Sequence, residues 1–152
     1  MGSEKAQSQA QKGVSMNNIL FFLTPKAMCA FLYDDYTMRQ ALEKMESAGY
    51  VTLPILNKRG EYRGTLSEGD LLWGLKNLCY MDMRQAEAHR IMTIAHRRDY
   101  QPVRVTASMQ DLVERAKNQN FVPVVDDFGS FIGIVTRSAI IKYCSDQLFP
   151  ED

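Results

Sequence analysis

Apolar and polar residues alternate along the chain in two blocks that carry the same succession of patterns. Strands show β-rich runs and helices show apolar residues three and four positions apart. In the first block, a strand, a helix, two strands and a helix are predicted at 29–33, 37–48, 51–56, 61–66 and from Ser67 onward. The second block repeats this order at 101–105, 109–118, 121–125, 131–135 and 137–148. The pattern therefore predicts two copies of one strand-helix-strand-strand-helix unit.

Residue identities repeat together with these patterns. The motif at 64–70 reads Gly-Thr-Leu-Ser-Glu-Gly-Asp, and the motif at 133–139 reads Gly-Ile-Val-Thr-Arg-Ser-Ala. These motifs lie 69 residues apart, whereas Thr37 matches Ser108 at an offset of 71, so the second copy has lost two residues in between. An internal repeat of this kind predicts two like units packed against each other, with a site between them.

The regions that flank the repeats complete the predicted organisation. Residues 1–15 are rich in Gln, Ser, Ala and Lys without a core pattern, and we interpret them as a disordered tail or an expression remnant. A short helix at 17–23 is grouped with the first repeat, and a connecting helix at 83–94 with the second. The predicted divisions are 1–15, 16–80, 81–148 and a C-terminal tail at 149–152.

Composition narrows the classes of function. The 152 residues are 45% apolar and 24% charged, with equal numbers of acidic and basic side chains, which disfavours binding to nucleic acid. Cys29, Cys79 and Cys144 are too widely spaced for a Cys-x-x-Cys metal site and odd in number, so a reducing cytoplasm is expected. No apolar run approaches the ~20 residues that span a bilayer, so we expect no membrane insertion.

Catalytic signatures are missing from the sequence. It contains no phosphate-binding Gly-x-x-x-x-Gly-Lys-Ser/Thr loop, no Gly-x-Ser-x-Gly elbow and no His-Glu-x-x-His pair. His89 and His96 lie seven residues apart without a cysteine or a paired acid that would complete a metal site. We therefore expect a non-enzymatic protein that requires no cofactor and holds no metal.

The repeated residues resemble the CBS domain, and two copies resemble the pair known as a Bateman module. The likeness runs from about Pro25 to Tyr143. The residues that carry it are Ala41-Leu42, Met45, Gly49-Tyr50, Leu53-Pro54-Ile55-Leu56, Gly60, Gly64, Ser67-x-x-Asp70, Val122-Pro123-Val124-Val125-Asp126, Gly129 and Gly133-Ile134-Val135-Thr136. The resemblance implies an α+β fold in which two CBS repeats pack as a pseudo-two-fold pair, with an adenine nucleotide as a regulatory ligand in a cleft between them.

Ser67 and Asp70 are the first candidates for contact with such a ligand. A hydroxyl at a helix start lies beside free backbone N–H groups, where the helix dipole favours phosphate. Asp70 is placed to accept hydrogen bonds from the two hydroxyls of a ribose. The alternative is a helix capping box, which has the same Ser-x-x-acid spacing.

The resemblance adds two further segments to the candidate ligand-binding residues, one before the first strand at 26–28 and one at the start of the proline strand at 50–54. Lys26 is then a candidate for contact with phosphate, or else a solvated surface charge, and Tyr50 is expected to stack on the base. The alternative for Tyr50 is that it and Phe121 are matched core aromatics. The complete set of candidate ligand-binding residues is Lys26, Ala27, Met28, Tyr50, Val51, Thr52, Pro54, Ser67, Asp70, Arg104, Thr136 and Arg137.

The second copy is expected to contribute differently from the first. Ala139 stands where the first copy has Asp70, so it offers no carboxylate to a ribose. A guanidinium at a helix start is disfavoured by the dipole but pairs well with phosphate, so Thr136 and Arg137 are expected to complete a shared phosphate site. Arg104 is a further candidate, or an outward residue on an edge strand.

A closer resemblance links the chain to bacterial cyclic-di-AMP-binding CBS proteins. It rests on Lys-Ala before the first strand, Gly-Tyr before the proline strand, and Asn-x-Phe-Val and Gly-Ile-x-Thr-Arg in the second copy. It implies a receptor for AMP, ATP or cyclic di-AMP (c-di-AMP) that signals to a partner enzyme or transporter. The alternative is a ligand-free dimerisation module. A homodimer would form through helix residues Leu72, Leu75, Leu78, Ile140, Ile141 and Tyr143.

Overall fold

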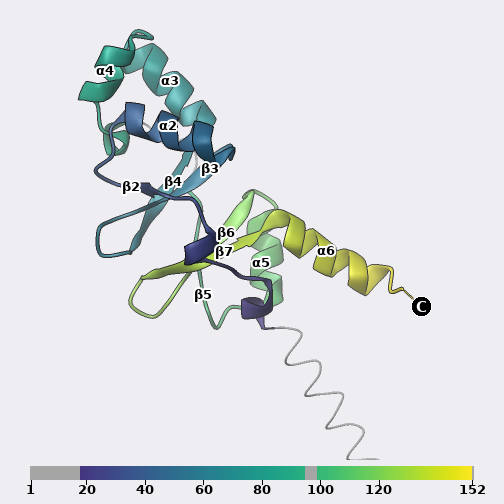
Figure 1. The fold of residues 1–152 in the computed structure, drawn as a ribbon. Helices are drawn as coiled ribbons and strands as arrows, with labels where there is room; N and C mark the ends of the chain where they lie inside the picture. The colour runs from purple at the N-terminus through teal and green to yellow at the C-terminus, as the bar shows by residue number, and fades with distance from the viewer. Residues whose placement is uncertain (1–17, 95–98, 152) are drawn as a thin grey trace, which may run out of the picture.

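The computed structural model describes residues 18–94 and 99–151, which form two sheets, one for each repeat (Figure 1). The first sheet has the strand order β2 (Leu32–Tyr33), β3 (Thr52–Leu56) and β4 (Tyr62–Ser67). The second has the order β1 (Thr24–Pro25), β7 (Phe131–Thr136), β6 (Phe121–Val125) and β5 (Val103–Arg104). In each sheet the two longer strands are antiparallel, and β2 and β5 run parallel to their neighbours β3 and β6. The short strand β1 pairs antiparallel with β7. The predicted α+β fold with two equivalent units is confirmed.

The helices begin where the hydroxyl-bearing residues of the repeat predict. The α-helices are α2 (Met38–Ala48), α3 (Glu68–Leu78), α4 (Met83–Ala88), α5 (Met109–Ala116) and α6 (Arg137–Leu148). Short 3₁₀ helices are η1 (Ile19–Phe22), η2 (Lys26–Met28) and η3 (Ile91–Thr93). The side chains that cap α2, α3, α5 and α6, each accepting an N–H from the first turn, are those of Thr37, Ser67, Ser108 and Thr136.

The segments that lead into the two repeats are exchanged between their cores. Ile19 of η1 is 1% exposed and packs in the core of the second repeat, although the sequence grouped η1 with the first repeat. Helix α4, grouped with the second repeat, places Ala86 in the core of the first. Ile91 and Ile94 follow it there. Each segment buries its apolar side chains on the neighbouring repeat, a preference that chain order does not reveal.

The repeated glycines Gly133 and Gly64 lie against the residues that precede the first strand of the opposite repeat, Thr24 and Asp99. Thr24 and Pro25 of β1 pair with Ile134 and Gly133 of β7. A Cβ on Gly133, whose φ is +156°, would overlap the carbonyl oxygen of Thr24. A Cβ on Gly64, whose φ is +145°, would lie 2.7 Å from the carboxylate of Asp99. Glycine is therefore required at both positions, because Thr24 and Asp99 of the opposite repeat approach the backbone closely.

The helix residues expected at a homodimer contact differ in their exposure. Leu75 and Ile140 are buried in the cores of their own repeats, so they are not available to a second chain. Tyr143 is half-buried against Phe22. The residues of the set that stay exposed are Leu72, Leu78 and Ile141. Among the described helices, none is long and apolar enough to cross a membrane.

Candidate functional site

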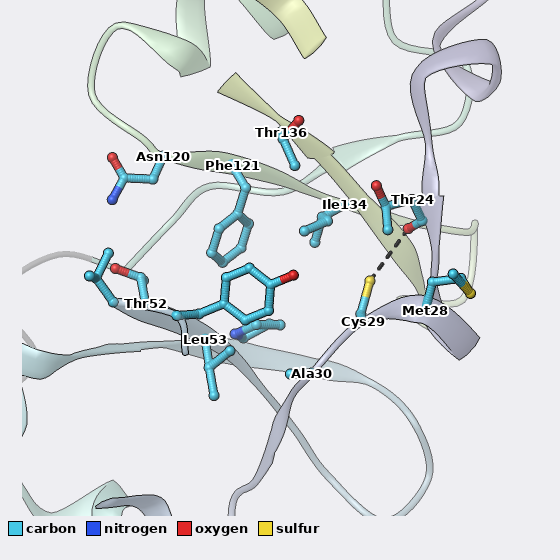
Figure 2. A pocket seen from close by; sticks show the side chains of 13 residues that line it. Thr24, Met28, Cys29, Ala30, Thr52, Leu53, Asn120, Phe121, Ile134 and Thr136 are labelled. Carbon is cyan, nitrogen blue, oxygen red and sulfur yellow. Dashed lines mark hydrogen bonds between the residues drawn. The ribbon is translucent and has the colours of Figure 1, made fainter. Parts of the chain in front are cut away.

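A cavity of about 270 Å³ lies between the two repeats (Figure 2). The first repeat contributes the segment 24–30 that precedes β2, together with the start of β3. The second repeat contributes the start of β6 and the end of β7. Its lining residues are Thr24, Met28, Cys29, Ala30, Tyr50, Val51, Thr52, Leu53, Pro54, Asn120, Phe121, Ile134 and Thr136.

Backbone hydrogen bonds fix both walls of the cavity at helix starts. The Glu68 N–H at the start of α3 donates to the Val51 carbonyl at 2.9 Å. On the opposite wall, the Arg137 N–H at the start of α6 donates to the Asn120 carbonyl at 2.9 Å. The loops that end in Val51 and Asn120 are thus held by corresponding bonds, one in each repeat.

The cavity combines an apolar interior with an exposed apolar rim. Figure 2 shows Phe121 and Ile134 projecting from the second-repeat strands toward Leu53 of the first. Leu53 and Phe121 are 2% and 6% exposed, whereas Tyr50 and Val51 at the rim are 58% and 55% exposed. A concave apolar surface with a few polar groups is the usual form of a site for a small organic ligand.

Polar atoms of the lining are few. The Thr136 hydroxyl accepts the Ala139 N–H at 3.2 Å, and the Cys29 thiol donates to the Thr24 carbonyl at 3.4 Å. Burial raises the pKa of the Cys29 thiol above its ordinary value, so this group is protonated at neutral pH. No basic side chain is among the lining residues. The described part of the chain also contains no cluster of His, Cys, Asp and Glu side chains able to hold a metal.

The structure brings half of the predicted site residues together at the cavity. Those that line it are Met28, Tyr50, Val51, Thr52, Pro54 and Thr136. Those that do not are Lys26, Ala27, Ser67, Asp70, Arg104 and Arg137.

Ser67 and Asp70 form the capping box that the sequence left as an alternative. The Ser67 N–H donates to Asp70 Oδ2 at 2.9 Å, and the Asp70 N–H donates to Ser67 Oγ at 3.0 Å. Asp70 is 2% exposed and does not reach the cavity. The geometry favours the structural role of this pair, and ribose binding by Asp70 stays a prediction.

The three predicted cations face other groups. Arg137 Nε donates to the carbonyls of Ala116 and Gln119 at 2.9 and 3.0 Å, which ties the start of α6 to the end of α5. Arg104 lies on the edge strand β5, where its guanidinium is 3.9 Å from the Asp127 carboxylate. The Lys26 ammonium lies 5.8 Å from the centroid of the Phe31 ring, and the neighbouring Ala27 is exposed.

The aromatic residues of the site are not matched core residues. Phe121 lies opposite the helix cap Thr136, just as Thr52 lies opposite Ser67, so Phe121 corresponds to Thr52 and not to Tyr50. Both pairs, Thr52 with Phe121 and Ser67 with Thr136, are 69 residues apart, so the sequence offset within the strands indicates this correspondence. The two-residue difference between the copies therefore lies before Val51, which corresponds to Asn120. Lining residues that the candidate set lacked are Thr24, Cys29, Ala30, Leu53, Asn120, Phe121 and Ile134.

Solved structures similar to this chain share the whole arrangement of two repeats. CbpB in complex with c-di-AMP superposes with a TM-score of 0.77 at 20% identity, covering 97% of this chain and 95% of that chain. CbpB of Listeria monocytogenes in complex with c-di-AMP gives 0.78 at 19% identity, covering 89% and 100%. CBSX2 in complex with AMP gives 0.66 at 22% identity, covering 87% and 98%. At these identities the likeness shows the fold.

The sequence also matches a known family directly. No curated protein matches the chain. The CBS domain, however, matches residues 26–77 and again residues 91–146, which together span more than half of the chain. The first match contains β2, β3 and β4, and the second contains β5, β6 and β7. The chain belongs to the CBS domain family and carries two CBS domains in tandem.

Proposed function

We propose that this protein is a non-enzymatic cytoplasmic receptor that binds an adenine nucleotide in the cavity between its CBS domains. The observation that carries the proposal is the exposed apolar rim beside an apolar cavity, formed by Met28, Tyr50 and Val51. Exposed apolar side chains grouped at one concave site mark a surface that a ligand covers.

The base enters between the two walls. Phe121 and Val51 supply apolar contact from opposite sides, and Tyr50 stacks on the face that remains open. The side chains of Thr52 and Asn120 supply hydrogen-bonding groups for the edge of the base. Phosphate lies toward the start of α6 at Thr136, where the helix dipole favours an anion.

The class of ligand is supported by the similar structures, which hold c-di-AMP in CbpB and AMP in CBSX2. The cavity volume of 270 Å³ lies near the lower end of the range of roughly 300–1,000 Å³ typical of ligand sites. A site of this size encloses one adenine-bearing half of a ligand. The second half of c-di-AMP, or the further phosphates of ATP, would extend past the rim.

Signalling follows from the position of the ligand between two domains. A nucleotide that contacts both repeats favours the arrangement in which both walls fit it, and it shifts the population toward that arrangement. The exposed residues Leu72, Leu78 and Ile141 offer helix faces to a second chain, and a partner enzyme or transporter would sense the change in shape.

Calorimetry and thermal shift with AMP, ATP, S-adenosylmethionine and c-di-AMP test the proposal, with cyclic di-GMP as the control for the base. A ligand at one hundred times its Kd raises the free energy of unfolding by about 2.7 kcal/mol. Val51→Glu adds a negative charge at an exposed rim position, so the variant should fold normally and lose binding. Absence of binding to all four compounds would instead favour a ligand-free dimerisation module.

A further inference from the structure

The pseudo-two-fold relation gives residues of one repeat counterparts in the other wherever the two copies share a register. Leu32 and Val103 occupy the same register position in β2 and β5, 71 residues apart. At this offset Cys29, a small residue of the cavity wall, corresponds to Tyr100. Tyr100 is 8% exposed, so a large aromatic side chain fills the space that corresponds to Cys29.

Tyr100 contacts two residues that line the nucleotide cavity. Its ring centroid lies 4.8 Å from that of Phe121, with an angle of 67° between the planes. Its hydroxyl accepts the backbone N–H of Asn120 at 3.1 Å. The edge-to-face contact and the hydrogen bond fix neighbouring residues of the second-repeat wall.

The backbone of Tyr100 is anchored to the first repeat. Its N–H donates to the Thr65 hydroxyl at 3.2 Å, and its carbonyl accepts the Tyr62 hydroxyl at 2.7 Å. Thr65 and Tyr62 both belong to β4, and Thr65 is 1% exposed. Burial and the nearby Asp99 raise the pKa of Tyr62, which keeps its hydroxyl protonated as the donor. Tyr100 therefore connects a strand of one repeat to the cavity wall of the other.

We propose that Tyr100 is a positioning residue for the nucleotide site: it holds Asn120 and Phe121 at a spacing that β4 of the first repeat sets. This inference rests on the proposed function, because it concerns the same cavity. Tyr100 is not among the residues that line the cavity, so it acts through the two that are. A shift of β4 relative to β6 would change the width of the site.

Tyr100→Phe tests this role, since it keeps the ring and removes the acceptor of the Asn120 N–H. We expect its Kd for the tightest of AMP, ATP and c-di-AMP to rise at least fivefold, measured below the melting temperature of the variant. Val124→Ala is the matched control. Val124 is 0% exposed on β6, the strand of Phe121, and does not line the cavity. This control should lower the melting temperature and leave Kd unchanged.

Thr65→Val removes the hydroxyl that holds the Tyr100 N–H, at a residue that does not itself line the cavity, and provides a second variant should Tyr100→Phe fail to fold. It should also weaken nucleotide binding. If the wild type binds nucleotide and the folded Tyr100 and Thr65 variants bind as tightly, the positioning role is refuted while the proposed function stands. If the wild type binds no nucleotide, both are refuted.

Discussion

Ser67 and Asp70 bind each other through reciprocal hydrogen bonds across the first turn of α3, at 2.9 and 3.0 Å. Asp70 is 2% exposed, so the carboxylate is enclosed by the fold that it stabilises. The same pair of residue types that suits a ribose and a phosphate is here engaged in beginning a helix.

Asp70→Ala should therefore lower stability and leave binding intact. Loss of a cap lowers the free energy of unfolding by about 0.5–2 kcal/mol, and burial of the freed Ser67 N–H places this variant near the upper value. Urea unfolding and calorimetry measure the two effects. Asp111→Ala removes the exposed acid of the capping box of α5 and should destabilise less. A tenfold loss of nucleotide affinity in Asp70→Ala alone would return Asp70 to the binding site.

Tyr50→Ala should weaken nucleotide binding with little effect on the fold. Stacking of a base on an aromatic side chain contributes about 1–3 kcal/mol, which corresponds to a rise in Kd of roughly 5- to 150-fold. Because Tyr50 is 58% exposed, the melting temperature of the free protein should change little. Phe128→Ala, which removes an aromatic ring that is 86% exposed and outside the cavity lining, is the control. Equal affinity of the two variants would remove Tyr50 from the site.

Gly133→Ala should disrupt the pairing of β1 with β7. Its methyl group would overlap the Thr24 carbonyl oxygen, whereas Gly129→Ala, at φ +81°, meets no atom within 4 Å. Both changes add backbone strain, so the difference between them reports the lost contact. We expect the larger drop in melting temperature for Gly133→Ala, together with weaker nucleotide binding, because Thr24 lines the cavity.

The Cys29 thiol should react slowly at neutral pH and faster as the pH rises. Burial raises its pKa above 9.0, and a weaker effect of a hydrogen bond with the backbone of Ile134 opposes this. Alkylation requires the thiolate, so the rate should increase about tenfold per pH unit up to this raised pKa. Peptide mass spectrometry after iodoacetamide treatment follows the reaction, and Cys29→Ser identifies the peptide. Saturating nucleotide should slow alkylation, and an unchanged rate would argue against a ligand beside Cys29.

The fold could be predicted because the repeated elements are encoded locally. Local residue types mark each element: Thr37 and Ser108 begin helices, Gly49 ends one, and the proline strands are rich in β-forming residues. The packing of η1 and α4 could not be predicted, because an apolar pattern shows that side chains are buried and does not show in which of two cores.

The site could be predicted only in part, for a related reason. Residues on continuous strands, such as Thr52 and Thr136, follow from the repeat register. Arg137 did not, because its guanidinium reaches carbonyls at the end of α5, a contact between segments with no shared pattern. The candidate set lacked Asn120 and Phe121, because their position on the cavity wall follows from the register of β6 with β7.

The exchange of η1 and α4 makes the two CBS domains one folding unit. Each core is incomplete without a segment that chain order assigns to its neighbour, so removal of either domain would leave apolar side chains such as Ile19 or Ala86 without their contacts. The pair should therefore unfold in a single cooperative transition. A nucleotide bound to one domain then raises the free energy of unfolding of both domains together, including faces that the nucleotide does not contact.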